Sequence, residues 1–286
     1  MHPNEHALTA PKARALLAAQ MPDLAALPLR RVGAEGTDNV LFRLGLNLLL
    51  RFPRLPHAGA QLDRIARWLP TLPLPLPVPR ILRLGQPGPG YPFPWAVTPF
   101  LPGHPAPPSL SDPAPARALA ETLRALQSRP LPKDAPSRRD ADSLPHRLAG
   151  LEALIPAVTE SAPGPLFTLL ARLRTLPPPT ESPVWTHGDL HPLNLLIHRG
   201  RLTALIDWGS LAAGDAAIDL LPAFMAFDGP ARAAFLTAMA PSEAALDRAR
   251  AIALSKVIRG LPYYRPSNPT FYAVLLASLP RVLAAP

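Results

Sequence analysis

Hydrophobic and polar residues alternate along residues 29–52 in the way that β-strands require. Val40, Phe42 and Leu44 fall on one face of a predicted strand, because side chains two positions apart share a face. Gly45-Leu46-Asn47 then supplies turn residues, and the apolar run 48–52 follows. We therefore predict a β-hairpin in this part of the chain.

The pattern changes from strands to helices near residue 101. A short helical stretch is predicted at about 59–69, and the proline-rich segment after it suits only extended strands and loops, with a last strand in 96–103. The next helix begins at Ser111-Asp112-Pro113, where proline stands in the first turn. Further helices are predicted at 144–155, at 165–176 and, in three or four pieces, across 216–286. A β-rich part, residues 1–101, is thus followed by a mostly helical part, residues 102–286.

Residues 184–208 interrupt the helical part with a second predicted hairpin. Two short apolar runs, NLLI and LTALI, flank His198-Arg199-Gly200-Arg201. The polar cluster HGDLHPLN precedes the first run, and DWG follows the second. Pairing of the two strands would carry Asp189, Asn194 and Asp207 to one end of a small ribbon.

Composition narrows the classes of protein that fit. Cysteine is absent from the 286 residues, which excludes disulfides and thiolate chemistry, and a reducing cytosol suits such a chain best. No uncharged apolar run approaches the ~20 residues needed to span a bilayer, so we expect a cytoplasmic protein without a membrane partner. The net charge of +9 comes from scattered basic residues without interleaved aromatic residues, and we expect no nucleic-acid partner.

The polar cluster favours a hard metal ion and proton transfer. His187 and His191 have the spacing of a helical zinc site, but Gly188, Pro192 and the lack of a neighbouring Glu argue against one. No G-x-S-x-G elbow is present, and the glycines of 85–90 lie in a proline loop, which disfavours a serine nucleophile and a dinucleotide site. One carboxylate and one amide are oxygen donors that suit Mg²⁺ with nucleotide phosphates. A second carboxylate can then accept the proton of an attacking hydroxyl.

The motifs HGDLHPLN and IDWG are spaced like the catalytic loop and metal motif of protein kinases, and in this wording they resemble the aminoglycoside and macrolide phosphotransferase family. The segments 36–54, 67–79 and 214–223 resemble that family in the same order. The resemblance implies an α+β, bilobal, protein-kinase-like fold. Residues 1–101 would form the nucleotide-binding lobe, and residues 102–286 a helical lobe with the catalytic loop and the acceptor site.

Position by position, the resemblance implies Asp189 as the catalytic base, with Asn194 and Asp207 as the Mg²⁺ ligands. The residues implied to bind a nucleoside triphosphate, ATP or GTP, are Gly36, Thr37, Asp38 and Asn39 near the phosphates, Arg51 in place of the strand lysine, and Leu101 beside the base. Arg51 is a reasonable substitute because a guanidinium binds phosphate oxygens with two N–H groups, and no lysine occurs between Lys12 and Lys133.

Other positions depart from the family pattern or leave alternatives open. Ile65 stands where an acid should pair with the strand cation, so Asp63 or no acid serves. Pro99 has no N–H for a base, which is why Leu101 is the predicted donor. His187 is expected to be structural and His191 to be loop surface. Asp219 either contacts the catalytic loop backbone or serves as a cap or solvated residue.

The acceptor is predicted to be a small-molecule alcohol, and its identity is open. Residues 215–286 contain five acids and seven bases, which does not suit a polycationic aminoglycoside. Tyr263, Tyr264, Phe271 and Tyr272 could line an apolar cleft for a macrolide or another bulky alcohol, although Phe271 is expected to pack in the core. The alternative function is a nucleotide-binding module without phosphate transfer, which Ile65 and Arg51 favour.

Overall fold

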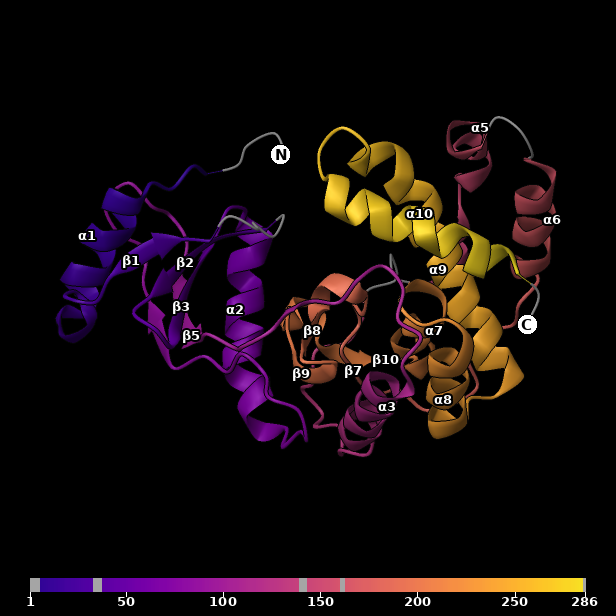
Figure 1. Ribbon diagram of the computed structural model, residues 1–286, viewed down its shortest axis with the longest axis horizontal. Coiled ribbons are helices and arrows are strands. Elements are labelled where there is room, and N and C mark those ends of the chain that lie inside the picture. The colour runs from indigo at the N-terminus through magenta and orange to yellow at the C-terminus, as the bar shows by residue number, and fades with distance from the viewer. Residues whose placement is uncertain (1–5, 33–37, 139–142, 160–162, 285–286) are drawn as a thin grey trace. The chain divides into compact units, whose positions relative to one another are not determined.

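The computed structural model describes residues 6–32, 38–138, 143–159 and 163–284, and divides into two compact units (Figure 1). The first unit comprises Met1–Pro73 with Pro77–Pro102, and the second comprises Leu74–Leu76 with Gly103–Pro286. The first carries the large sheet and the second most of the helices, so the predicted α+β class is confirmed. None of the helices among the described residues is long and apolar enough to cross a membrane.

The first unit is a twisted antiparallel sheet covered by helices. Its strands, in the sheet order β1-β2-β3-β5-β4, are β1 (Leu29–Arg31), β2 (Asn39–Leu44), β3 (Leu48–Pro53), β5 (Trp95–Pro99) and β4 (Arg83–Gly85). The predicted hairpin is β2–β3, with Gly45 at φ +59° in the turn, a conformation that glycine adopts without strain. Val40, Phe42 and Leu44 are buried as the alternation predicts.

Two helices complete the first unit. Helix α2 (Pro56–Trp68) lies against β3 and β5, and its buried face includes Leu62 and Ile65. Helix α1 (Ala10–Gln20) was not predicted, although Ala13, Leu16 and Leu17 are buried at helical spacing. Its apolar stripe is short, and the side chains of the β2–β3 hairpin complete its packing in the same core.

The second unit consists of helices around two small β-elements. Its helices are α3 (Pro113–Gln127), α4 (Leu144–Leu148), α5 (Ile155–Val158), α6 (Gly164–Leu173), α7 (Pro222–Met225), α8 (Gly229–Met239), α9 (Glu243–Tyr264) and α10 (Pro269–Leu283). The helix predicted at 144–155 is divided into α4, a 3₁₀ turn and α5, because Gly150 has φ +70° and Pro156 cannot continue a helix from the preceding turn. Helix α10 packs along α9 (Figure 1).

The β-elements of the second unit position the polar cluster. Strand β8 (Leu195–His198) pairs with β9 (Arg201–Leu205) on one side and with β6 (His104–Pro105) on the other. The predicted turn is confirmed, with Arg199 at φ +49° and Gly200 at φ +74°, as a two-residue hairpin turn requires. Strand β7 (Val184–Thr186) pairs with β10 (Ala212–Gly214).

Candidate active site

The loop that carries Asp189 begins where the buried strand β7 ends. Gly188 has φ +84°, and a Cβ atom there would lie 1.7 Å from Nη2 of Arg138 and 2.9 Å from the Ser210 carbonyl oxygen. Only glycine suits this position, because both the backbone conformation and the available space exclude a side chain. Arg138 in turn donates to Thr186 Oγ1 at 3.0 Å, which ties the loop to its strand.

Asp219 holds the backbone of this loop. Its carboxylate accepts the N–H of His187 at 3.0 Å and the N–H of Gly188 at 2.9 Å, and the side chain is fully buried. Burial raises the pKa of Asp219, and the nearby His187 and the two backbone N–H groups oppose that rise. Of the two interpretations of Asp219, contact with the catalytic loop backbone is therefore the one confirmed.

His187 is a structural residue, as predicted. Its Nε2 lies 3.1 Å from the Ile206 carbonyl oxygen, and its Nδ1 accepts the N–H of Asp189 at 3.3 Å. The ring is fully buried, 4.5 Å from the Trp208 ring centroid. Burial lowers the pKa of His187, although the carboxylates of Asp219 and Asp189 act in the other direction. A neutral ring with a proton on Nε2 satisfies both hydrogen bonds.

The predicted ribbon joins Asp189, Asn194 and the segment before Asp207. Asn194 is buried, and its Nδ2 donates to the Asp189 carbonyl oxygen at 2.8 Å. The main-chain carbonyl oxygen of Asn194 accepts the N–H of Ile206 at 3.1 Å, and Ile206 directly precedes Asp207. Asp207 itself is exposed, with φ +62°, and precedes a 3₁₀ turn at Trp208–Ser210. Because Nδ2 is committed to a carbonyl, Oδ1 is the atom of Asn194 that can bind a cation.

This donor set suits Mg²⁺. Asn194 contributes an amide oxygen and Asp207 a carboxylate, and Mg²⁺ commonly takes one or two protein oxygens while keeping water and phosphate ligands. Over the described residues, no group of three or more His, Asp or Glu side chains is arranged to hold a metal ion by itself.

The Asp189 carboxylate has two neighbours that the sequence analysis did not anticipate. Lys256 of α9 donates to Oδ1, and Nε2 of His191 lies 3.7 Å from Oδ2. Burial by itself would raise the pKa of Asp189, but the charge of Lys256, together with the nearby His191 ring, outweighs it and holds the pKa well below its usual value. The carboxylate is thus ionised at neutral pH, with 30% of its side chain exposed.

His191 differs from its prediction as loop surface. The residue is buried, and its ring lies 4.7 Å from the ring centroid of Phe271 in α10. Phe271 is buried too, as predicted, while Tyr263 is 47% exposed. The packing of α10 over the loop explains the burial of His191, because the loop sequence alone contains no partner for its ring.

The residues predicted to bind the nucleotide lie in the first unit. Gly36 and Thr37 are outside the described residues, Asp38 directly precedes β2, and the buried Asn39 is the first residue of that strand. Arg51 is a buried residue of β3. Leu101 is half-buried and follows Phe100, whose N–H is committed to the Asn47 carbonyl at 2.7 Å.

Helix α2 carries no acid on its buried face where the family pattern expects one. Ile65 is fully buried in the core, and Asp63 lies on the exposed side of the same helix. Because Arg51 is buried in the sheet, the exposed position of Asp63 does not favour it as the partner of Arg51.

Comparison with known proteins identifies the family. The model of a phosphotransferase enzyme family matches residues 29–252, a span that includes both hairpins and the whole polar cluster. The chain belongs to the phosphotransferase enzyme family. The resemblance inferred from HGDLHPLN and IDWG is thereby confirmed.

Individual relatives of this phosphotransferase agree with the family assignment. This chain is 33% identical over 183 residues to an aminoglycoside 3′-phosphotransferase of Streptomyces fradiae. The alignment covers 59% of this chain and 66% of the relative. The fold of this chain is similar to the GDP complex of an aminoglycoside 2′-phosphotransferase-IIIa, with a TM-score of 0.70, 18% identity and coverage of 96% and 99% of the two chains. A macrolide 2′-phosphotransferase from Brachybacterium faecium gives a TM-score of 0.58, 22% identity and coverage of 88% and 92%. The predicted bilobal kinase-like fold is confirmed by these similarities.

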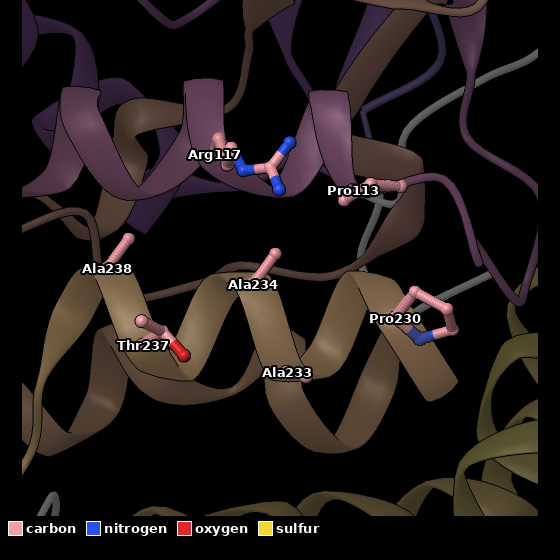
Figure 2. Close-up of a pocket in the computed structure, with 7 residues that line it drawn as sticks. All are labelled: Pro113, Arg117, Pro230, Ala233, Ala234, Thr237 and Ala238. Atoms are coloured by element: carbon pink, nitrogen blue, oxygen red, sulfur yellow. The ribbon is translucent and has the colours of Figure 1, made fainter.

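A separate hollow of about 460 Å³ lies between α3 and α8 of the phosphotransferase. Figure 2 shows Arg117 of α3 and Ala234 and Ala238 of α8 around it. The lining contains none of the predicted site residues and only one charged side chain, so this hollow contributes nothing to the chemistry of the site.

The buried His187 predicts a specific pH dependence of stability. Between its lowered folded pKa and about pH 6.5, the unfolded state binds a proton that the folded state does not. The free energy of unfolding of the phosphotransferase should therefore fall as the pH drops below about 6.5, with a His187 contribution of up to ~1.4 kcal/mol per pH unit. His187→Gln, which keeps an N–H for Ile206, should lose this contribution.

Urea unfolding of both proteins between pH 5 and pH 8 measures the difference. His198→Gln is the matched control, because His198 is an exposed histidine of β8. If the free energy of unfolding changes with pH in the same way in the wild type and in His187→Gln, the buried His187 ring is not neutral.

Proposed function

We propose that this phosphotransferase transfers the γ-phosphate of ATP or GTP to a hydroxyl of a small-molecule alcohol, such as an antibiotic or a related metabolite. The observation that carries the proposal is the chain of hydrogen bonds from Asp219 through Gly188 and Asn194 to Ile206. These bonds tie together the backbone segments that carry Asp189, Asn194 and Asp207. The names of the relatives, aminoglycoside and macrolide phosphotransferases, support the same class of acceptor.

In this proposal Asp189 orients the acceptor hydroxyl and takes its proton. The hydroxyl oxygen forms a bond to the γ-phosphorus, the bond from that phosphorus to the β–γ bridging oxygen breaks, and a nucleoside diphosphate leaves. Asn194 and Asp207 would hold Mg²⁺, and the bound ion would neutralise charge on the phosphates. The three groups have separate tasks, because a carboxylate bound to the metal cannot also be the base.

Residues 1–101 form the proposed nucleotide-binding lobe and residues 102–286 the catalytic and acceptor lobe. Arg51 contacts the α- and β-phosphates in this proposal, and Gly36, Thr37, Asp38 and Asn39 are assigned to the phosphate end of the nucleotide. The N–H of Leu101 donates to the nucleotide base. GDP in the complex of a structural neighbour supports a nucleotide site in this fold.

A nucleotide-binding module without transfer is the second candidate. The buried Ile65, in the place of an acid, favours it. An assay of phosphate transfer from ATP and GTP to aminoglycosides, macrolides and simple alcohols separates the two candidates. We expect transfer that stops when EDTA removes divalent ions and returns with added Mg²⁺. Binding of nucleotide with Mg²⁺ but without transfer or hydrolysis would support the module and contradict the enzyme.

Asp207 should set the Mg²⁺ requirement of this reaction. Asp207→Asn removes the charged ligand, and the Mg²⁺ concentration for half-maximal activity should rise by about 10- to 100-fold or more. Glu243→Gln, at an exposed position of α9, is the charge-matched control. An unchanged Mg²⁺ dependence in Asp207→Asn would remove Asp207 from the metal site.

A further inference from the structure

The ammonium group of Lys256 lies beside the proposed base. It donates to Oδ1 of Asp189, and the two side chains are 24% and 30% exposed. Nζ also lies 5.9 Å from the ring centroid of Phe271, which packs against His191, the second neighbour of the carboxylate. An acceptor hydroxyl that reaches Asp189 therefore lies next to a cation held by α9 and α10.

Within the described residues 215–284, most carboxylates are already engaged and do not offset this cation. Residues 215–286 contain five acids. Four of them bind elsewhere: Asp215 to Arg248, Asp219 to the loop backbone, Asp228 to Ser109 and Ser111, and Asp247 to Arg172. The fifth, Glu243, stands thirteen residues before Lys256 on α9, about 20 Å away along a helix.

A second basic residue follows Lys256 on the same side of α9. Arg259 is exposed, and its guanidinium donates to the carbonyl oxygens of Arg147 and Ala149. Residues three apart on a helix are neighbours, and carbonyl acceptors do not neutralise the guanidinium. This side of α9 therefore carries two basic residues, and among the described residues Asp189 is the carboxylate in contact with Lys256.

We infer that the acceptor carries an anionic group, a carboxylate or a phosphate, close to its reactive hydroxyl, and that Lys256 binds that group. This inference rests on the proposed phosphate transfer and names the class of its acceptor. When the anionic group of the acceptor binds the Lys256 ammonium, Oδ1 of Asp189 becomes accessible to the acceptor hydroxyl. The hydroxyl proton then passes to Asp189 as the hydroxyl oxygen attacks the γ-phosphorus. An ammonium group next to the hydroxyl, as in an aminoglycoside, would instead be repelled by Lys256.

Matched pairs of acceptors test the inference in the full-length protein. The carboxylate arm compares pantothenate with panthenol and glycerate with glycerol, and the phosphate arm compares glycerol 3-phosphate with glycerol. Kanamycin and erythromycin represent cationic acceptors. In the wild type, kcat/KM should be about 10- to 100-fold higher for the anionic member of at least one pair, the range that a hydrogen bond to a charged group supplies. The arm with the larger ratio identifies the anion.

Lys256→Met keeps the apolar stem and removes the charge. It should reduce the anionic-to-neutral ratio of kcat/KM to about 1. Lys256→Arg should retain most of the ratio, because it restores a cation. Lys133→Ala removes an exposed lysine of the same unit and should behave like the wild type.

Two outcomes would overturn the inference. One is a wild type that phosphorylates neutral or cationic acceptors but no anionic acceptor, or that prefers kanamycin. The other is an anionic-to-neutral ratio that survives in Lys256→Met. If the ratio survives while kcat/KM falls equally for both acceptors, Lys256 acts on the transferred phosphate instead. Failure of the proposed function differs from both, because nucleotide would then not be consumed with any acceptor, or would be consumed equally by the wild type and Asp189→Asn.

Discussion

Replacing Asp189 by Asn should lower kcat for phosphate transfer by about 10²- to 10⁴-fold, the range for removal of a general base. The amide cannot take the hydroxyl proton, yet it is close to the carboxylate in size. The carbonyl and N–H of residue 189 still bond to Asn194 and His187, so the loop should keep its conformation. Nucleotide affinity should change little, because the proposed phosphate and metal ligands are intact.

The measurement is kcat with saturating nucleotide and acceptor, together with nucleotide binding by calorimetry. Asp247→Asn is the matched control, since Asp247 lies on α9 away from Lys256 and its carboxylate pairs with Arg172 of α6. A variant Asp189→Asn with at least a tenth of the wild-type kcat would show that Asp189 is not the base. A large loss of nucleotide affinity would instead point to a binding role.

Asp219→Ala should be the most destabilising of the substitutions considered. It leaves the N–H groups of His187 and Gly188 without their acceptor in a fully buried position, at a cost of about 1–3 kcal/mol for each donor. We expect the free energy of unfolding to fall by about 2–5 kcal/mol. Phosphate transfer should be lost as well, even under conditions where the variant is folded, because these two residues set the position of Asp189.

Urea unfolding measures this effect, and two variants calibrate it. Asp219→Asn keeps one acceptor oxygen and should lie between the wild type and Asp219→Ala. Asp228→Ala also removes a carboxylate with two hydrogen bonds, but its partners are the hydroxyls of Ser109 and Ser111 near the surface, where water can replace it. A loss in Asp219→Ala no larger than that in Asp228→Ala would show that the loop does not depend on Asp219.

Some contacts of the catalytic loop join residues that are close in sequence, and others depend on packing between distant parts of the chain. Asp189 and Asn194 are five residues apart, and a hairpin with Arg199 and Gly200 in its turn brings Ile206 back to Asn194. These relations depend on near neighbours, so the sequence alone was enough to predict the ribbon. Lys256 lies 67 residues from Asp189, and its approach depends on the packing of α9. A single lysine in a long helix contains no sign of the partner that it meets.

The secondary structure shows the same division. The alternation of Val40 and Phe42 specified the hairpin of the first unit, because a period of two is a strong local signal. The helix predicted at 144–155 was divided in the structure, since the glycine and proline within that segment break the helical pattern. Helix α1 was missed, because its few apolar residues gain their burial from side chains of the sheet.

By itself, the sequence determined the family, the α+β class, the two hairpins and the order of the acidic and amide residues. Each of these features depends on residues that are only a few positions apart, where covalent geometry limits the possible arrangements. Only the tertiary structure decided that Asp219 holds the loop backbone, that His191 is buried under Phe271 and that Lys256 meets Asp189. Those contacts join residues far apart in the chain, and the packing of whole helices, rather than any local pattern, brings them together.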